Sequence, residues 1–144
     1  MKKLLSLCCV LLLAGCSTAQ SEENTTVCKL SEDGMEITNT LVYKGDEVIK
    51  QTIDSAVTVE GADTETLTAF MDEYAKLYDD IKGTQYSYDL KDNVLTENII
   101  IEYSSENIED LLEMGIISSE EENIRFVSYK QTIDLLKESG FTCK

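Results

Sequence analysis

Apolar and polar side chains alternate along residues 35–57, the pattern of a β-strand with one buried face. The alternation is interrupted at Lys44-Gly45-Asp46, where glycine and aspartate favour a turn, and it resumes beyond that point. Residues 34–59 therefore predict a β-hairpin. Residues 27–30 form a further short apolar segment that could pair ahead of this hairpin.

The same alternation returns along residues 86–103 and is interrupted at Asp92-Asn93. Asparagine and aspartate tolerate the backbone conformation of a tight turn, so this segment predicts a second hairpin. Ile100 makes the middle of the last strand apolar on both faces. That pattern indicates a strand in the interior of the sheet.

Between the hairpins, apolar side chains recur every three or four positions, which predicts a helix with one apolar face. Asp63 or Thr64 can cap its start, and Gly83 ends it. The apolar stripe consists of Leu67, Phe70, Met71, Tyr74, Leu77, Tyr78 and Ile81. Its aromatic residues could line a ligand cleft, but packing against the protein core is the preferred interpretation.

Two shorter helices are predicted after the second hairpin. One ends at Gly115, and the other opens with a capping box at Ser128 and ends at Gly140. The order of the elements predicts a single α+β domain over residues 27–144. We expect an antiparallel sheet of two hairpins plus an N-terminal strand, with one long and two short helices packed on one face.

The first 15 residues have the parts of a secretory signal peptide, with Lys2 and Lys3 ahead of an apolar run of ten positions. The sequence Leu13-Ala14-Gly15-Cys16 resembles the bacterial lipobox, which implies cleavage before Cys16 and diacylglycerol on its sulfur. An ordinary secretory signal with a chance cysteine is the alternative. Polar residues 16–26 predict a lipidated, flexible tether. We therefore expect a membrane-anchored protein on the extracytoplasmic face of a bacterial membrane.

Charge narrows the classes of partner. Loss of Lys2 and Lys3 with the signal peptide changes the formal charge from −16 to −18. Such a surface repels nucleic acid, and it leaves lipid on Cys16 as the expected contact with the membrane. The chain has no histidine, the commonest general base and a frequent metal ligand. No cofactor is expected.

The cysteine count suggests a cross-link. Cys8 and Cys9 leave with the signal peptide and Cys16 carries the lipid, so Cys28 and Cys143 remain. An even pair in an extracytoplasmic protein predicts a disulfide, here joining the first strand to the last residues. Two free, buried thiols are the alternative.

Candidate catalytic and metal-binding groups are few. Zinc is disfavoured because the remaining cysteines are expected to pair. Calcium ligands could come from Asp79-Asp80, from Asp89 with Asp92, or from Glu120-Glu121-Glu122, but none has the spacing of a calcium-binding loop. A hydrolase without histidine would need a lysine-based dyad or a pair of carboxylates. No catalytic residue is predicted.

The segment Thr40-Leu41-Val42-Tyr43-Lys44-Gly45-Asp46-Glu47-Val48-Ile49-Lys50-Gln51 resembles the signature hairpin of the YehR-like lipoproteins. The lipobox, the tyrosine-containing helix and the Gly140-Phe141 step extend this resemblance over most of the mature chain. It implies a small α+β lipoprotein domain whose biochemical role is not established, so no catalytic residue carries over. Cys28 and Cys143 depart from some members of the family.

The leading hypothesis is a non-catalytic, monomeric domain that binds an envelope protein or peptide ligand. It is favoured by the lipid anchor, the short tether, the compact acidic domain and the missing catalytic groups. A calcium-binding surface module and a hydrolase lacking histidine are the two alternatives.

Overall fold

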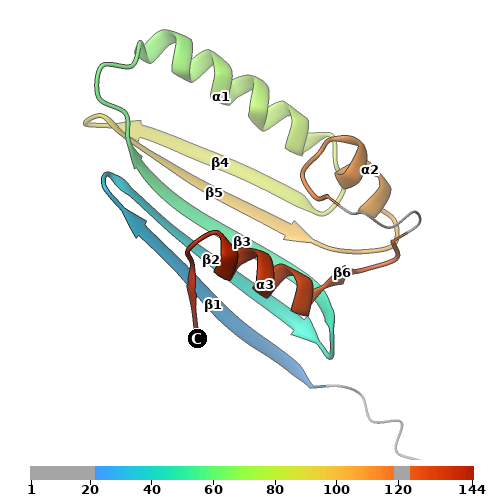
Figure 1. The fold of residues 1–144 in the computed structure, drawn as a ribbon. Helices are drawn as coiled ribbons and strands as arrows, with labels where there is room; N and C mark the ends of the chain where they lie inside the picture. Colours follow the sequence, from blue (N-terminus) through green and yellow to red (C-terminus); the bar gives the residue numbers. More distant parts are fainter. Residues whose placement is uncertain (1–21, 119–123) are drawn as a thin grey trace, which may run out of the picture.

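The computed structural model describes residues 22–118 and 124–144. Within them, an antiparallel sheet of seven strands carries one long and two short helices on one face, which confirms the predicted α+β class (Figure 1). The elements are β1 (Glu23–Glu32), β2 (Met35–Lys44), β3 (Glu47–Thr58), α1 (Thr64–Asp79), β4 (Thr84–Lys91), β5 (Val94–Glu102), α2 (Ile108–Glu113), β6 (Val127–Ser128), α3 (Tyr129–Glu138) and β7 (Thr142–Cys143).

The sheet has the strand order β4-β5-β3-β2-β1-β7, with the short β6 beside β3. The two predicted hairpins are β2–β3 and β4–β5, and they are joined by the antiparallel pairing of β3 with β5. Asp92 and Asn93 have φ angles of 52° and 61°, as a tight two-residue hairpin turn requires. The local turn signals in the sequence therefore locate both hairpins correctly.

The N-terminal strand is longer than predicted. Residues 23–26 belong to β1, where Glu23 pairs with Lys44 and Thr26 pairs with Leu41. The predicted boundary at Val27 is therefore wrong, because residues 23–26, predicted as part of the tether, belong to the first strand. Pairing with β2 satisfies the backbone of this segment, so its polar side chains can remain largely exposed. The predicted signal peptide (residues 1–15) and Cys16 lie outside the described residues.

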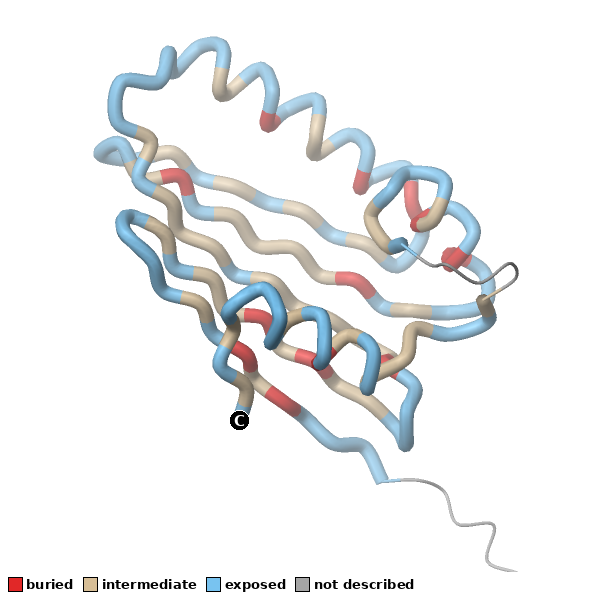
Figure 2. The backbone as a smooth tube through the Cα atoms, in the orientation of Figure 1, coloured by how far each residue is buried: buried red, intermediate tan, exposed pale blue. Residues whose placement is uncertain are grey.

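The core consists of two clusters of buried side chains. One lies beneath α3 and contains Cys28, Leu41, Val48 and Ile133. The other lies near α2 and contains Ile81, Ile101 and Leu111. Tyr103 packs against both clusters. Figure 2 shows these buried positions in red, with mostly half-buried backbone along the middle of the sheet between them.

A buried polar side chain joins three elements near α2. Asn107 is 1% exposed, and its amide nitrogen donates to the carbonyls of Lys82 (2.7 Å) and Glu102 (2.8 Å). Its side-chain oxygen accepts from the backbone N–H of Ser104 (3.0 Å). Gly83 lies close by with a φ of 80°, and a Cβ there would come within 2.9 Å of the Glu102 carbonyl. Asn107 therefore fixes the entry to β4 and the start of α2 against the end of β5.

Candidate functional site

A row of paired residues crosses the sheet on the face that the helices cover. Asn39 pairs with Ile53, Ile53 with Ile99, and Ile99 with Tyr86. Directly paired residues share a face of the sheet, and Tyr86 packs against Tyr78 of α1, so this is the helical face. Ile53 and Ile99 are nevertheless only half-buried. The helices leave part of this apolar row accessible to solvent.

One side of α1 faces this accessible part of the sheet. Phe70, Tyr74 and Leu77 share that side because they are spaced by four and three residues. Tyr74 packs edge-on against Tyr86 of β4, the cross-strand partner of Ile99, so this side lies next to the accessible row. Phe70 is 59% exposed and Leu77 is 42% exposed. Both side chains line a shallow surface hollow together with Glu73, Tyr74 and Lys76 of the same helix.

These exposures correct the interpretation of the whole α1 stripe as core. Met71 and Tyr78 are buried, as core packing predicts, but Phe70 and Leu77 are not. The reason is that α1 lies over β4, the edge strand of the sheet. The hydroxyl of Tyr88 on β4 donates a hydrogen bond to the carboxylate of Asp72 on the helix (2.7 Å). A helix placed on an edge strand has less sheet beneath it than its apolar stripe could cover.

A pocket of about 240 Å³ lies beside α3. Leu135 of α3 lines it and is 60% exposed, a residue that the sequence patterns did not single out. Tyr103 and Gln51 also line it, from the end of β5 and from β3. The remaining lining residues are Ile116, Ile117, Ser118, Val127, Thr132, Leu136 and Ser139. We call this the α3 pocket.

The accessible apolar side chains of the helical face thus come from four elements. They are Ile53 of β3, Phe70 and Leu77 of α1, Ile99 of β5, and Leu135 of α3. We call these five residues the interhelical strip. Monomeric proteins expose single apolar residues routinely, whereas several on one face mark an interaction site more often.

Hydrogen-bonding groups accompany the strip. Gln51 donates to the side-chain oxygen of Asn39 (3.1 Å) and accepts a hydrogen bond from the Tyr103 hydroxyl. Tyr86 donates to Glu97 at 2.6 Å. Burial raises the pKa of Tyr103, and burial together with the Glu97 hydrogen bond raises the pKa of Tyr86. Both phenols are therefore neutral donors at neutral pH, which suits recognition rather than nucleophilic attack.

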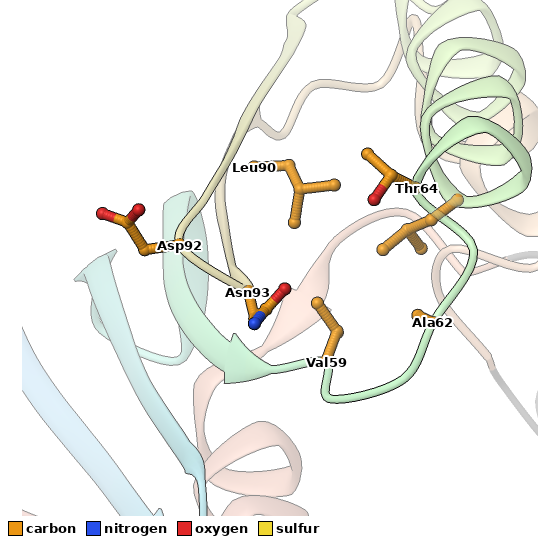
Figure 3. A pocket seen from close by; sticks show the side chains of 7 residues that line it. Val59, Ala62, Thr64, Leu90, Asp92 and Asn93 are labelled. Carbon is orange, nitrogen blue, oxygen red and sulfur yellow. The ribbon is translucent and has the colours of Figure 1, made fainter.

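A second cavity lies at the far end of the β4–β5 hairpin. It measures about 170 Å³ and lies between the Asp92-Asn93 turn and the start of α1, lined by Val59, Ala62, Thr64, Leu67, Leu90, Asp92 and Asn93 (Figure 3). The carboxylate of Asp92 points away from the neighbouring side chains. The backbone N–H of Val59 donates to the carbonyl of Asn93 (2.8 Å), so the lining is held rigidly.

The structure brings the two predicted disulfide partners together. Cys28 of β1 lies opposite Cys143 of β7, with Cα atoms 3.9 Å apart and sulfur atoms at a bonding distance of 2.05 Å. Backbone hydrogen bonds in both directions between Val27 and Lys144 (3.0 and 2.9 Å) hold β7 on the sheet edge. The pair contributes to the core beneath α3 and is separate from the strip.

The candidate calcium ligands are not gathered into a site. Among the residues that the structure describes, no group of three or more acidic or cysteine side chains could hold a metal ion. Asp79-Asp80 ends α1, and Asp89 and Asp92 lie on β4 and in the turn after it. Glu120-Glu121-Glu122 lies outside the described residues.

A hydrolase lacking histidine could use a lysine-based dyad, and two exposed lysines form ion pairs with carboxylates. Lys82 pairs with Glu106, and Lys130 pairs with Asp134 at 2.6 Å. The hydroxyl of Ser128 instead caps α3, accepting from the N–H of Gln131 (3.2 Å). In residues 22–118 and 124–144, no helix is both long and apolar enough to cross a membrane.

Residues 24–142 match the family described as "Protein of unknown function (DUF1307)". The chain belongs to this family. It is 28% identical over 123 residues to "Uncharacterized lipoprotein Lin0239" of Listeria innocua, and 24% identical over 123 residues to "Uncharacterized lipoprotein Lmo0207" of Listeria monocytogenes. Each match covers 83% of this chain and 80% of the relative. The DUF1307 match spans the strip and Cys28, and it ends one residue before Cys143.

Solved structures show the same architecture. The NMR structure of the Escherichia coli YehR protein matches with a TM-score of 0.66 and 26% identity, covering 85% of this chain and 91% of YehR. The NMR structure of a Streptococcus pneumoniae protein matches with a TM-score of 0.55 and 17% identity, covering 100% and 96%, and so shares the fold. The resemblance to the YehR-like lipoproteins is confirmed.

Proposed function

We propose that this DUF1307 chain is a lipoprotein anchored through Cys16 on the extracytoplasmic side of the membrane, and that its domain binds another envelope protein without catalysing a reaction. The lipobox and the names of the two Listeria relatives support the anchor. Cys16→Ala should abolish metabolic incorporation of a labelled fatty acid. Unchanged incorporation in that variant would contradict the anchor.

The observation that carries the binding role is the interhelical strip. Phe70 and Leu135 expose 59% and 60% of their surface, although the same helices carry the buried residues Met71 and Ile133. Complete burial of one such side chain contributes about 1.5–3 kcal/mol. A partner that covered the strip would gain several times this amount before the entropy cost of association. In the folded chain without a partner, this apolar surface remains exposed to water.

The charge around the strip indicates the chemistry of the partner. Helices α1 and α2 carry the acidic residues Glu65, Asp72, Glu73, Asp79, Glu109, Asp110 and Glu113 against the single basic residue Lys76. Helix α3, which supplies Leu135, is balanced, with Lys130 and Lys137 against Asp134 and Glu138. An amphipathic partner segment with apolar residues on one side and lysine or arginine on the other would match both properties. We therefore assign the strip to a positively charged, amphipathic segment of an envelope protein.

Calorimetric titration of the mature chain with two designed peptides tests this assignment. One peptide alternates apolar residues with lysine, and the other has the same apolar residues with glutamate. The lysine peptide should bind, and the glutamate peptide should bind more weakly because α1 and α2 repel it. No binding of either peptide, or equal binding of both, would contradict the proposed partner.

A matched pair of variants locates the binding surface. Phe70→Ser combined with Leu135→Ser should weaken binding of the lysine peptide at least about tenfold, since two apolar contacts together contribute about 1.4 kcal/mol or more. Met114→Ser is the control, because Met114 is 42% exposed but lies outside the strip. If the double variant binds as tightly as the control, the strip is not the binding surface.

A further inference from the structure

The tether leaves the domain at a defined end of the sheet. Six residues lie between Cys16 and Glu23, so the start of β1 lies within about 25 Å of residue 16 even when the connection is fully extended. The strand β3 has 12 residues and is about 40 Å long. The length of the sheet therefore exceeds the reach of the tether.

The strand pairing shows which segments lie next to the start of β1, at the same end of the sheet. Glu23 pairs with Lys44, Lys44 pairs with Glu47, and Glu47 pairs with Ser128. The start of β1, the β2–β3 turn, β6 and the start of α3 therefore lie together, as Figure 1 shows. We call this the tether end. Phe126 directly precedes β6 and therefore also lies at the tether end.

The tether end is held rigidly by the β2–β3 turn. The carboxylate of Asp46 accepts hydrogen bonds from the hydroxyl of Ser128 (2.8 Å) and from the backbone N–H of Lys130 (2.8 Å). Its carbonyl accepts from the N–H of Tyr129 (2.7 Å), whose ring stacks on Tyr43 at 3.7 Å. Because the β2–β3 turn is bonded to the start of α3, the sheet and α3 should take the same orientation relative to the membrane.

The charges of this end are balanced, since Lys44, Arg125 and Lys130 stand against Glu23, Asp46 and Glu47. Phe126 is 46% exposed and follows Arg125 in the chain. An aromatic ring can enter the interfacial region of a bilayer while the neighbouring guanidinium remains at the headgroups. The helical face, in contrast, carries the acidic excess of α1 and α2, which anionic lipid repels.

We infer that the anchored domain stands with its tether end toward the membrane, with Phe126 close to the lipid and the β4–β5 turn directed away from it. This inference rests on the proposed lipid attachment at Cys16. It places the α3 pocket near the bilayer, because Val127 at its rim pairs with Val48 at the tether end. A partner segment on the strip would then lie closer to the bilayer at Leu135, which lines the α3 pocket, than at Phe70.

Tryptophan substitution can measure this orientation, because the chain has no tryptophan of its own. Phe126→Trp reports on the tether end. Phe70→Trp is the matched control, since both positions are partly exposed phenylalanines. Phe70 lies between Thr68 and Asp72, the two residues that contact Tyr88.

The control lies far from the tether end. Tyr88 pairs with Glu97, and Glu97 pairs with Ser55. Ser55 lies eight residues beyond Glu47 along β3, a separation of about 25 Å. Energy transfer to a bilayer acceptor falls steeply over such a distance.

The experiment uses the lipidated mature chain in phosphatidylethanolamine–phosphatidylglycerol vesicles that contain a dansyl-labelled headgroup. Energy transfer from tryptophan to dansyl should be several-fold greater for Phe126→Trp than for Phe70→Trp. Equal transfer, or greater transfer from position 70, would overturn the proposed orientation. If Phe126→Trp does not fold, as judged by circular dichroism, Lys44→Trp replaces it with the same expectation, because Lys44 pairs with Glu23 and Glu47 at the tether end.

Sedimentation with vesicles separates this inference from the anchor itself. The lipidated chain should sediment with vesicles, and Cys16→Ala should not. Failure of the wild-type chain to sediment would contradict the proposed anchor. Sedimentation together with equal energy transfer would contradict the orientation alone.

Discussion

Reduction of the Cys28–Cys143 pair should strongly destabilise the domain. We propose that the two cysteines form a disulfide in the mature protein, as their contact in the structure supports. The bond would close a loop with a sequence separation of 115 residues. In the chain-entropy treatment, a loop of this length lowers the free energy of folding by about 5 kcal/mol, because the cross-link restricts the unfolded chain.

This magnitude is large relative to the stability of a domain of this size. Single domains are stable by about 5–15 kcal/mol, so the reduced chain should lose a third or more of its stability. The hydrogen bonds between Val27 and Lys144 would remain, at about 1 kcal/mol each. They are too weak to replace the cross-link. Reduced protein should therefore have a C-terminal segment that detaches before the rest of the sheet unfolds.

Urea denaturation of the mature chain with Cys16→Ser measures the effect, because only Cys28 and Cys143 then remain. With a denaturant slope of about 2 kcal/mol/M, reduction should lower the midpoint by about 2–3 M. The double variant Cys28→Ala with Cys143→Ala should respond as the reduced protein does and be insensitive to reductant. Coincident curves with and without reductant, or two reactive thiols in non-reducing denaturant, would refute the disulfide.

Two further predictions concern buried polar groups. Asn107→Ala should lower the free energy of unfolding by about 3 kcal/mol, because it leaves the carbonyls of Lys82 and Glu102 without their donor. Urea denaturation measures this loss, and a loss below about 1 kcal/mol would contradict the prediction. Burial raises the pKa of Tyr78, Tyr86 and Tyr103 above the ordinary value of 10.0, so their contribution to stability should be complete below pH 10 and lost as pH rises further. Absorbance titration should show that some phenols ionise only when the protein unfolds at alkaline pH. If all seven tyrosines ionise near pH 10 while the protein is still folded, the prediction is wrong.

Local signals in the sequence were sufficient for most of the fold. Period-two alternation and the Asp92-Asn93 turn located both hairpins, because turn chemistry and side-chain alternation act over a few residues. The caps were equally local: Asp63 accepts from the N–H of Thr66 (3.1 Å), and Ser128 caps α3. These features depend little on the rest of the chain.

Pairing between distant segments was harder to predict. Residues 23–26 are polar and carry no strand pattern, yet they extend β1 because β2 offers a complete set of backbone partners. The strand β6 has only two residues and pairs with the start of β3. The place of Asn39, which interrupts an apolar register, is explained by the hydrogen bond from Gln51. Each depends on a neighbour far away in the sequence.

The interhelical strip could not be predicted for a related reason. Helical spacing shows that Phe70 and Leu77 belong to an apolar stripe, but it does not show how much sheet lies beneath the helix. That depends on the strand order, which places α1 over the edge strand β4. In the last helix the spacing of Tyr129, Ile133 and Leu136 predicts the face that packs against the core, but it does not show that the adjacent Leu135 is 60% exposed beside a pocket.

The central claim is that the interhelical strip binds a positively charged, amphipathic segment. The most direct measurement is NMR of the mature chain during titration with the lysine peptide. Chemical-shift changes should concentrate at Ile53, Phe70, Leu77, Ile99 and Leu135. Changes confined to the opposite face of the sheet, at positions such as Thr38 and Thr52, would contradict the claim.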